Sequence, residues 1–390
     1  MSMRILFATG HGYPSDRLGG GAGHSVHALL EFAEGLGHHC EVAAALMPGP
    51  RYHCFRALRW LSGRHWTPVW REQRNGYDTR RTIGWVVPNL VRERIRAFRP
   101  DVVFTQLELC ENVVELALDA GLPAIVRVPD TDFHFFSGRL KDKPVLYLSN
   151  SRFVAARLRE RFGVESEVLY PIVRPERYET VRPDPGFITL VNPTPKKGLD
   201  LALEIAGRLP HRRFLFQESG RLDRHERRGL RARLAAHPNI TFRHETPSMR
   251  EVYAQTLALL VPSRWDEPFC RVILEAQASG IPILARAVGG IPETLSEGGI
   301  LLPAAAQAEA WAETLERLLS DLALYDRLSA AARRNVRRPA FAPAALGRRF
   351  LALAAAHVTR SRLATVSAVR WRRPAAGRVP GMAQGGRDHG

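Results

Sequence analysis

The residues whose types could do chemistry together lie in one short stretch, 257–280, which reads LALLVPSRWDEPFCRVILEAQASG. Apolar residues at 257–261 predict a buried strand, and the segment 262–268, which begins and ends with proline, predicts a turn. Apolar residues then recur with helical spacing, which predicts an amphipathic helix over 269–279. A strand, a turn and a helix in this order place the polar residues of the turn beside the start of the helix.

Two carboxylates and three backbone amides meet at that junction. Glu267 immediately precedes the predicted helix, and Glu275 lies two turns into it. The amides of Phe269, Cys270 and Arg271 are expected to be free donors at a helix N-terminus, where a phosphate binds readily. A phosphate between two carboxylates that hold sugar hydroxyls describes a nucleotide-sugar. Pairs of glutamates eight residues apart also occur by chance in helices, so the spacing alone does not decide.

Short apolar strands alternate with amphipathic helices along most of the chain. The series begins with RILFAT at 4–9, a glycine-dense loop and a helix over 24–36. Such alternation predicts parallel sheets with helices on both faces, so we expect an α/β fold of doubly wound, Rossmann-like units. Residues 47–82 are rich in Arg, Trp and His and lack a clear period, so we expect an insertion or a partner-facing surface there, mostly a solvated loop.

The length of the chain and a proline-rich break predict two domains. One hydrophobic core rarely serves 390 residues, and PIVRPERYETVRPDPG has neither strand nor helix periodicity. The predicted units are an N-terminal domain (1–170), a linker (171–186), a C-terminal domain (187–338), a C-terminal helix (339–364) that packs back on the N-terminal domain, and a disordered basic tail (365–390).

The net charge of +17 is concentrated at the C-terminal end. Residues 333–390 hold 13 arginines and one acidic residue, so the rest of the chain is only mildly basic. Charge confined to such a tail argues against a nucleic-acid partner and favours peripheral contact of 333–373 with anionic lipids. Without a membrane-spanning run, a signal peptide or paired cysteines, the chain is expected to be cytoplasmic, at most peripheral at the inner face of a membrane.

Five segments occur in an order that resembles a known family. They are GGGAG, NSRFVAARLRERFGV, NPTPKKG, EPFCRVILEAQASG and VGGIPETL. Together they resemble the family 4 nucleotide-sugar glycosyltransferases, also called glycosyl transferases group 1, over residues 4–335. The resemblance implies the GT-B architecture, in which two Rossmann-like domains face a cleft. The N-terminal domain then lies on the acceptor side, and the C-terminal domain binds the nucleotide-sugar donor.

The resemblance also implies roles for individual residues. Glu267 matches the first glutamate of the family motif, which contacts the donor sugar near the reacting carbon, and Glu275 matches the second, which holds the ribose hydroxyls. Lys197 matches the lysine that neutralises the donor diphosphate, a role that suits a compact ammonium. Gly20 and Gly21 match the glycine loop near the phosphates and the sugar.

The predicted donor site departs from the family pattern at three positions. Cys270 and Arg271 follow Glu-Pro-Phe where a small residue is usual, and we expect Cys270 to serve packing rather than chemistry. The arginine usually found shortly before Lys197 is absent, and Asn192 stands nearest to its place. Completion of the cationic clamp therefore requires Arg271 or another arginine.

The first domain lacks the histidine that family members present directly after a strand. The corresponding segment reads VRVPDTDFHF, with Val128 and Pro129 at the expected place. Asp130, Asp132 and His134 are the candidates for that role, with Asp130 and His134 preferred. A loop carboxylate is also often a turn or cap residue, so the residues alone leave the choice open.

The sequence therefore predicts a retaining glycosyltransferase of polysaccharide or glycolipid biosynthesis. Its donor is expected to be a UDP- or GDP-sugar, and its acceptor a glycan, a lipid-linked molecule or a small molecule. No cofactor or metal is expected, because Lys197 and the helix amides take the place that a metal holds elsewhere. The alternatives are another enzyme of this fold, such as a phosphorylase or an epimerase, and a nucleotide-sugar-binding protein with weak or lost transferase activity.

Overall fold

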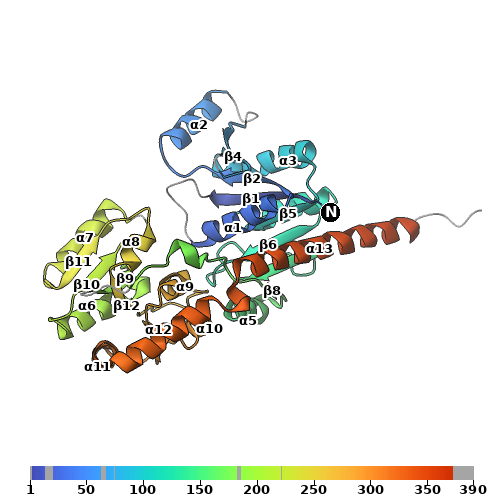
Figure 1. Cartoon of the computed structure of the whole chain (residues 1–390). Coiled ribbons are helices and arrows are strands. Elements are labelled where there is room, and N and C mark those ends of the chain that lie inside the picture. Colours follow the sequence, from blue (N-terminus) through green and yellow to red (C-terminus); the bar gives the residue numbers. More distant parts are fainter. Residues whose placement is uncertain are drawn as a thin grey trace, which may run out of the picture.

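The computed structural model describes residues 2–13, 21–62, 67–73, 75–181, 186–220 and 222–371, with side chains up to residue 363. These residues form two α/β domains and a long C-terminal helix that returns to the first domain (Figure 1). The prediction of two doubly wound α/β units is confirmed.

The described part of the N-terminal domain holds an eight-stranded sheet in the order β3-β4-β2-β1-β5-β6-β7-β8. Its strands are β1 (Arg4–Gly12), β2 (His39–Ala45), β3 (Trp70–Glu72), β4 (Asp78–Thr82), β5 (Val102–Gln106), β6 (Ala124–Val128), β7 (Val145–Ser149) and β8 (Glu167–Val168). Its helices are α1 (Gly21–Gly35), α2 (Pro50–Leu61), α3 (Val87–Phe98), α4 (Cys110–Asp119) and α5 (Arg152–Phe162). Because β2 and β5 lie on opposite sides of β1, a ligand crevice is expected at the carboxyl ends of β1 and β5.

The described part of the C-terminal domain holds a six-stranded parallel sheet in the order β11-β10-β9-β12-β13-β14. Its strands are β9 (Phe187–Val191), β10 (Phe214–Gln217), β11 (Ile240–Arg243), β12 (Thr256–Val261), β13 (Ile283–Arg286) and β14 (Gly299–Leu302). Its helices are α6 (Leu199–Arg208), α7 (Arg224–Leu234), α8 (Met249–Tyr253), α9 (Arg271–Ala278), α10 (Ile291–Leu295), α11 (Ala308–Ser320) and α12 (Leu322–Val336). The corresponding crevice lies between β9 and β12.

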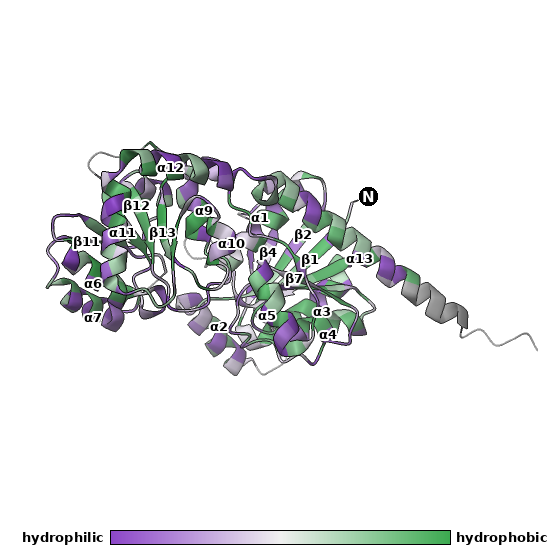
Figure 2. Ribbon diagram, turned by 90° about the horizontal axis from the view of Figure 1, so that it is seen from below, coloured by the Kyte–Doolittle hydropathy of each residue, from purple (hydrophilic) through white to green (hydrophobic). Residues whose placement is uncertain are grey.

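Both faces of each sheet are covered, which explains why the strands read as continuous apolar runs. In β1, Ile5 and Phe7 pack toward α1 and the C-terminal helix, whereas Leu6 and Ala8 pack toward α3 and α4. Figure 2 shows the strands of both domains as predominantly hydrophobic ribbons between more mixed helices. The cores thus fix the strand ends from which the loops of the cleft emerge.

Residues 47–82 are more regular than the sequence predicts. They contain α2 and also β4, a buried strand with the sequence DTRRT. Arg80 is bound by Asp78 at 2.9 Å, and Arg81 is bound by Glu72 at 3.0 Å. The expectation of a mostly solvated loop is therefore wrong for β4, because paired arginines occupy positions where a strand normally shows apolar residues.

Helix α13 (Pro343–Trp371) ties the C-terminal end of the chain to the N-terminal domain. Its Phe350 ring lies 5.2 Å from the Phe104 ring, and a Cβ atom at Gly347 would meet the ring of Phe32 at 2.3 Å. The helix continues past the boundary expected at 365, since 365–371 contains neither Gly nor Pro. Residues 372–390 of the expected tail lie outside the described residues. No helix in the described ranges is long and apolar enough to cross a membrane.

Packing of α13 yields a first prediction. Phe350→Ala should lower the free energy of unfolding by about 3–5 kcal/mol, because the ring is fully buried against the sheet. Leu363→Ala on the same helix removes an exposed side chain and should change it by less than about 0.5 kcal/mol. Urea unfolding of both variants measures the difference; equal losses would show that α13 is not part of the core.

Candidate active site

The carboxyl ends of β9 and β12 bring two distant segments together. The two strands pair in parallel, so the loops that follow them leave the sheet at the same edge. The loop after β9 carries Asn192 and Lys197, and the loop after β12 carries Ser263 and Glu267. Lys197 and Glu267, which the sequence predicts as functional residues, therefore meet at the crevice of the C-terminal sheet.

Glu267 is a buried carboxylate with two close partners. Lys197 Nζ lies 2.5 Å from Glu267 Oε1, and Ser263 Oγ donates to the same oxygen at 2.7 Å. An ammonium carries three N–H donors, so two remain available to another ligand. Because the Lys197 side chain is partly exposed, the cation can hold Glu267 and still face an anion.

Two glycines let another loop reach the backbone of Glu267. Gly289 has a φ of +56°, and a Cβ atom there would lie 2.4 Å from the Glu267 carbonyl oxygen. The Gly290 amide donates to that oxygen at 2.6 Å. The VGGIPE segment between β13 and α10 therefore fixes the position of Glu267, and a side chain at residue 289 would prevent this contact.

Helix α9 begins at Arg271, two residues later than the sequence predicts. Cys270 precedes it with a left-handed φ of +61°, and Phe269 turns inward against the rings of Tyr170 and Phe341. The inward turn of Phe269 delays the helix, so its first-turn amides are those of Arg271 and the next residues. The expectation that the Phe269 and Cys270 amides open the helix is corrected accordingly.

The thiol of Cys270 is not suited to nucleophilic chemistry. Burial, together with the negative charge of Glu267, raises its pKa far above the ordinary value. A protonated, buried thiol is a packing group, as the sequence interpretation expected.

Glu275 lies on the same side of the cleft as Glu267. Tyr253 donates its hydroxyl proton to Glu275 Oε2 at 3.0 Å, and Arg271 Nε lies 3.6 Å from Oε1. Burial raises the pKa of Tyr253 well above its usual value, so the phenol remains a donor. Glu275 is thereby held in one orientation, with its carboxylate at the cleft.

Arg271 reaches across to the N-terminal domain. Its Nη1 donates to Ser25 Oγ on α1 at 3.1 Å and to the Ile172 carbonyl at 3.0 Å. A Cβ atom at Gly21 would lie 2.9 Å from Arg271 Cδ, so the glycine permits this close approach. Gly20, the other predicted glycine, lies outside the described residues.

The two domains enclose a cleft of about 1150 Å³. Most predicted site residues line it, and they come from both domains: Gly21, Asp130, Asn192, Lys197, Glu267, Phe269, Cys270, Arg271 and Glu275. His134 is not among the lining residues; its side chain is 73% exposed, and its Nε2 lies 3.7 Å from Asp132. Asp130 does line the cleft, and burial raises the pKa of its carboxyl group.

Two further residues of the cleft were missed by the sequence interpretation. Arg127 is buried at the end of β6 and donates to Gln106 Oε1 at 3.0 Å; burial and the charge of Arg271 lower its pKa to about 9. The sequence signal is an arginine inside the apolar strand PAIVRV. His24 on α1 also lines the cleft, and loss of hydration followed by the charge of Arg271 lowers its pKa to about 4, so the imidazole is neutral at pH 7.

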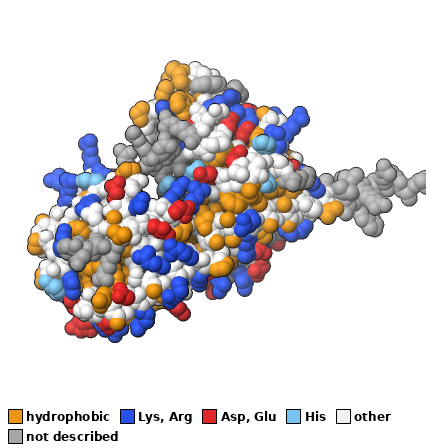
Figure 3. Space-filling view, in the orientation of Figure 1, with side chains coloured by type: hydrophobic (Ala, Val, Ile, Leu, Met, Phe, Trp, Pro, Cys, Tyr) orange, Lys and Arg blue, Asp and Glu red, His pale blue; other side chains and the backbone are white. Residues whose placement is uncertain are grey.

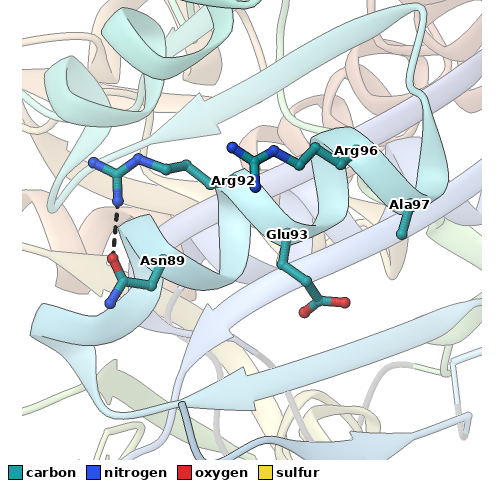
Figure 4. Close-up of a pocket in the computed structure, with 5 residues that line it drawn as sticks. All are labelled: Asn89, Arg92, Glu93, Arg96 and Ala97. Carbon is teal, nitrogen blue, oxygen red and sulfur yellow. Dashed lines mark hydrogen bonds between the residues drawn. The ribbon is translucent and has the colours of Figure 1, made fainter. Parts of the chain in front are cut away.

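A second hollow, of about 470 Å³, lies on the outer face of α3 (Figure 4). It is lined by Asn89, Arg92, Glu93, Arg96 and Ala97, all from that helix. Arg92 donates to Asn89 at 2.8 Å rather than toward a common centre. A hollow formed by one helix face lacks converging groups, so we assign it no function.

Residues 179–335 match the family described as glycosyl transferases group 1. A 71-residue segment is 44% identical to a D-inositol 3-phosphate glycosyltransferase of Corynebacterium aurimucosum, over 18% of this chain and 17% of that protein. The chain thus spans about a sixth of the length of that curated relative.

Two solved structures share the fold of both domains. A glycosyltransferase from Rickettsia africae has a TM-score of 0.71 and 18% identity over 92% of this chain and 99% of its own. The Anabaena protein HepE, solved with UDP-glucose, has a TM-score of 0.69 and 16% identity over 91% of this chain and 100% of its own. At these identities the likeness establishes the fold alone.

The burial of Arg127 yields a second prediction. Arg127→Met removes a buried charge that is repelled by Arg271, so the free energy of unfolding should stay unchanged or rise by about 1–2 kcal/mol despite the loss of the Gln106 contact. Arg127→Lys keeps the charge and should show no gain. Urea unfolding at pH 7 compares the three proteins. A loss of more than about 1 kcal/mol in Arg127→Met would show that the guanidinium stabilises the fold.

Proposed function

We propose that this chain, whose residues 179–335 match the family described as glycosyl transferases group 1, transfers a sugar from a nucleoside-diphosphate sugar to an acceptor hydroxyl. The proposal includes a UDP- or GDP-sugar as donor, retention of the anomeric configuration, and a reaction without a metal ion. It also places the reaction in the cytoplasm.

The observation that carries the proposal is the meeting of Lys197, Glu267 and Glu275 along one side of the cleft. One cation and two oriented carboxylates match the parts of a nucleotide-sugar, in which a diphosphate joins two hydroxyl-bearing sugars. The carboxylates accept hydrogen bonds from hydroxyls, and the ammonium binds the diphosphate. The volume of the cleft leaves room for an acceptor on the opposite side.

The donor is placed by three contacts in this proposal. Its diphosphate lies between Lys197 and the first amides of α9, where the helix dipole also favours negative charge. Its ribose hydroxyls donate to Glu275, and its transferred sugar donates to Glu267. The loops after β10 and β11 line the same cleft, and in this proposal they bind the base of the nucleotide.

Two arginines are candidates for the cation that the family pattern places before Lys197. Both line the cleft, and burial, followed by the charge of Arg271, lowers the pKa of Arg127 to about 9. Two like charges held beside each other in a cleft attract an anion placed between them. We assign the missing half of the cationic clamp to this pair.

In the proposed reaction, the bond between the anomeric carbon and the diphosphate oxygen breaks, and its electron pair leaves with the diphosphate. The acceptor oxygen forms the new bond to the same carbon on the face that the diphosphate leaves, which retains the configuration. The acceptor proton passes to the departing diphosphate oxygen. Lys197 stabilises the charge that develops there, and Asp130 accepts a hydrogen bond from a neighbouring hydroxyl of the acceptor and so orients the reacting one.

One observation favours a second function. Val128 and Pro129 occupy the place of the family histidine, so the acceptor side lacks an expected polar group. A protein that binds a nucleotide-sugar without transferring it would fit this departure. Binding of a donor measured by calorimetry, with no release of nucleoside diphosphate in the presence of any acceptor tested, would support that alternative.

Adjacent lysines provide a matched test of the donor site. Lys197→Ala should lower kcat/KM by about 10²–10³-fold, because it removes the cation that faces the leaving diphosphate. Lys196→Ala should stay within about threefold of the wild type, since Lys196 Nζ is exposed and lies 3.5 Å from Asp132. Release of UDP or GDP from a panel of nucleotide-sugars gives the rates, and circular dichroism checks the fold. Full activity of Lys197→Ala would refute the assigned site.

A second pair tests the acceptor side. Asp130→Ala should lower kcat by about 10²-fold, because it removes the carboxylate that lines the cleft and orients the acceptor. His134→Gln should leave kcat within about twofold, since that side chain is 73% exposed and is not among the residues that line the cleft. If the His134 variant lost more kcat than the Asp130 variant, His134 and not Asp130 would be the residue that orients the acceptor. Transfer to the acceptor, rather than hydrolysis of the donor, is the quantity to measure.

A further inference from the structure

Helix α2 (Pro50–Leu61) has an unusual relation to its domain. It projects beyond the sheet at the edge of the N-terminal domain (Figure 1), and none of its twelve residues is buried. Such a helix gains little from packing, and helices this short are marginal in water by themselves. The side chains that it presents to solvent therefore call for an explanation.

The outward side of α2 is apolar. At about 100° per residue, one stripe is formed by four residues that are all exposed, namely Cys54, Ala57, Leu58 and Leu61. The half-buried residues are those on the opposite side, namely Tyr52, Phe55 and Arg59. The inward side also holds two aromatic rings, so α2 is apolar on both sides, whereas an ordinary surface helix turns one apolar stripe toward the core and a polar face to solvent.

Neighbouring aromatic and apolar side chains extend the stripe into a patch. Trp60 is 84% exposed and Leu61 is 72% exposed; Met47, three residues before the helix, is also exposed, and so is Trp85, whose ring lies 6.4 Å from the ring of Tyr52 on the inward side. Figure 3 shows hydrophobic side chains gathered at the end of the molecule that α2 occupies in Figure 1. Exposed apolar side chains gathered on one element in this way indicate an interaction site.

The charges around the patch have one sign. Arg51 lies at one edge of the apolar stripe, 3.9 Å from the centre of the Trp70 ring, and Arg56 lies about 150° around the helix from the middle of the stripe. The sequence contains no acidic residue between Glu41 and Glu72. A helix with an exposed apolar stripe, an exposed Trp and arginines as its charged residues is typical of helices that lie in a membrane interface with anionic headgroups.

We propose that α2 is an interfacial anchor that inserts its outward stripe into the surface of a membrane containing anionic lipids. A second copy of the chain is a poorer occupant, because two such helices would bring like charges together with no acidic residue in the segment to offset them. Nucleic acid is also a poorer occupant, since phosphates would match the arginines and leave the apolar stripe unpaired.

The position of α2 connects this anchor to the cleft. Met47 lines the cleft, and α2 begins three residues later. A membrane bound by α2 therefore lies beside the N-terminal side of the cleft. This consequence rests on the proposed function: the acceptor would be a membrane-anchored molecule whose hydroxyl reaches the cleft from the lipid surface.

The test uses the full chain and vesicles of phosphatidylcholine with or without phosphatidylglycerol. Co-sedimentation should show binding to the anionic vesicles and much weaker binding to the neutral ones. Leu61→Asp should lower affinity for the anionic vesicles by about tenfold or more, because it places a charge in the inserted stripe. Leu322→Asp changes another exposed leucine, 59% exposed at the start of α12, and should leave binding unchanged.

A second measurement follows insertion directly. Cys54 is exposed on the outward stripe, whereas burial raises the thiol pKa of Cys40, Cys110 and Cys270. An environment-sensitive fluorophore attached at Cys54 should therefore shift to the blue when anionic vesicles are added. Donor hydrolysis in solution should be equal in wild type and Leu61→Asp, so failure of the anchor is distinguishable from failure of the proposed function.

Three outcomes would overturn the anchor. One is unchanged vesicle binding of Leu61→Asp, and another is absence of vesicle binding by the wild type. The third is loss of binding only when residues 372–390 are removed, which would assign the membrane contact to the basic C-terminal end. A wild-type dimer that becomes monomeric in Leu61→Asp, without vesicle binding, would identify a second copy as the occupant.

Discussion

The ion pair between Lys197 and Glu267 is the interaction on which the geometry of the cleft depends. A buried carboxylate is costly unless it is paired and hydrogen-bonded, and Glu267 is held by Lys197 at 2.5 Å and Ser263 at 2.7 Å. The pair joins the loops that follow β9 and β12, and the close approach of Gly289 secures the backbone of Glu267. A carboxylate fixed in this way presents the same geometry to every ligand, which is the preorganisation that catalysis and selective binding both require.

The N-terminal domain completes the cleft through a few polar contacts across the interface. Arg271 reaches Ser25 on α1, the Thr131 hydroxyl donates to the Asp266 carbonyl at 3.1 Å, and the Arg152 amide donates to Glu293 at 2.9 Å. Such contacts are weaker than a packed core, so they position the domains without locking them. The cation and the two glutamates of the C-terminal domain therefore face Asp130 and Arg127 of the other domain across the same space.

The sequence predicted the strands and the two α/β units because each depends on local patterns, and it predicted the residues that the structure brings together at the cleft. Strands covered on both faces read as apolar runs, and Glu267, Glu275 and Lys197 stand at the ends of such runs. It did not reveal β4, whose arginines are buried through ion pairs, nor the delayed start of α9, which follows from the inward turn of Phe269. Arg127 and the outward stripe of α2 were missed because burial and orientation depend on the neighbours that the tertiary fold supplies.

The central claim is that the side of the cleft formed by Lys197, Glu267 and Glu275 is a nucleotide-sugar donor site. A crystal structure with whichever of UDP and GDP binds more tightly tests it most directly. The account predicts the phosphates within hydrogen-bonding distance of Lys197 Nζ and the first amides of α9, with the ribose hydroxyls on Glu275. A nucleotide bound elsewhere, with no phosphate near Lys197 and no ribose contact to Glu275, would contradict it.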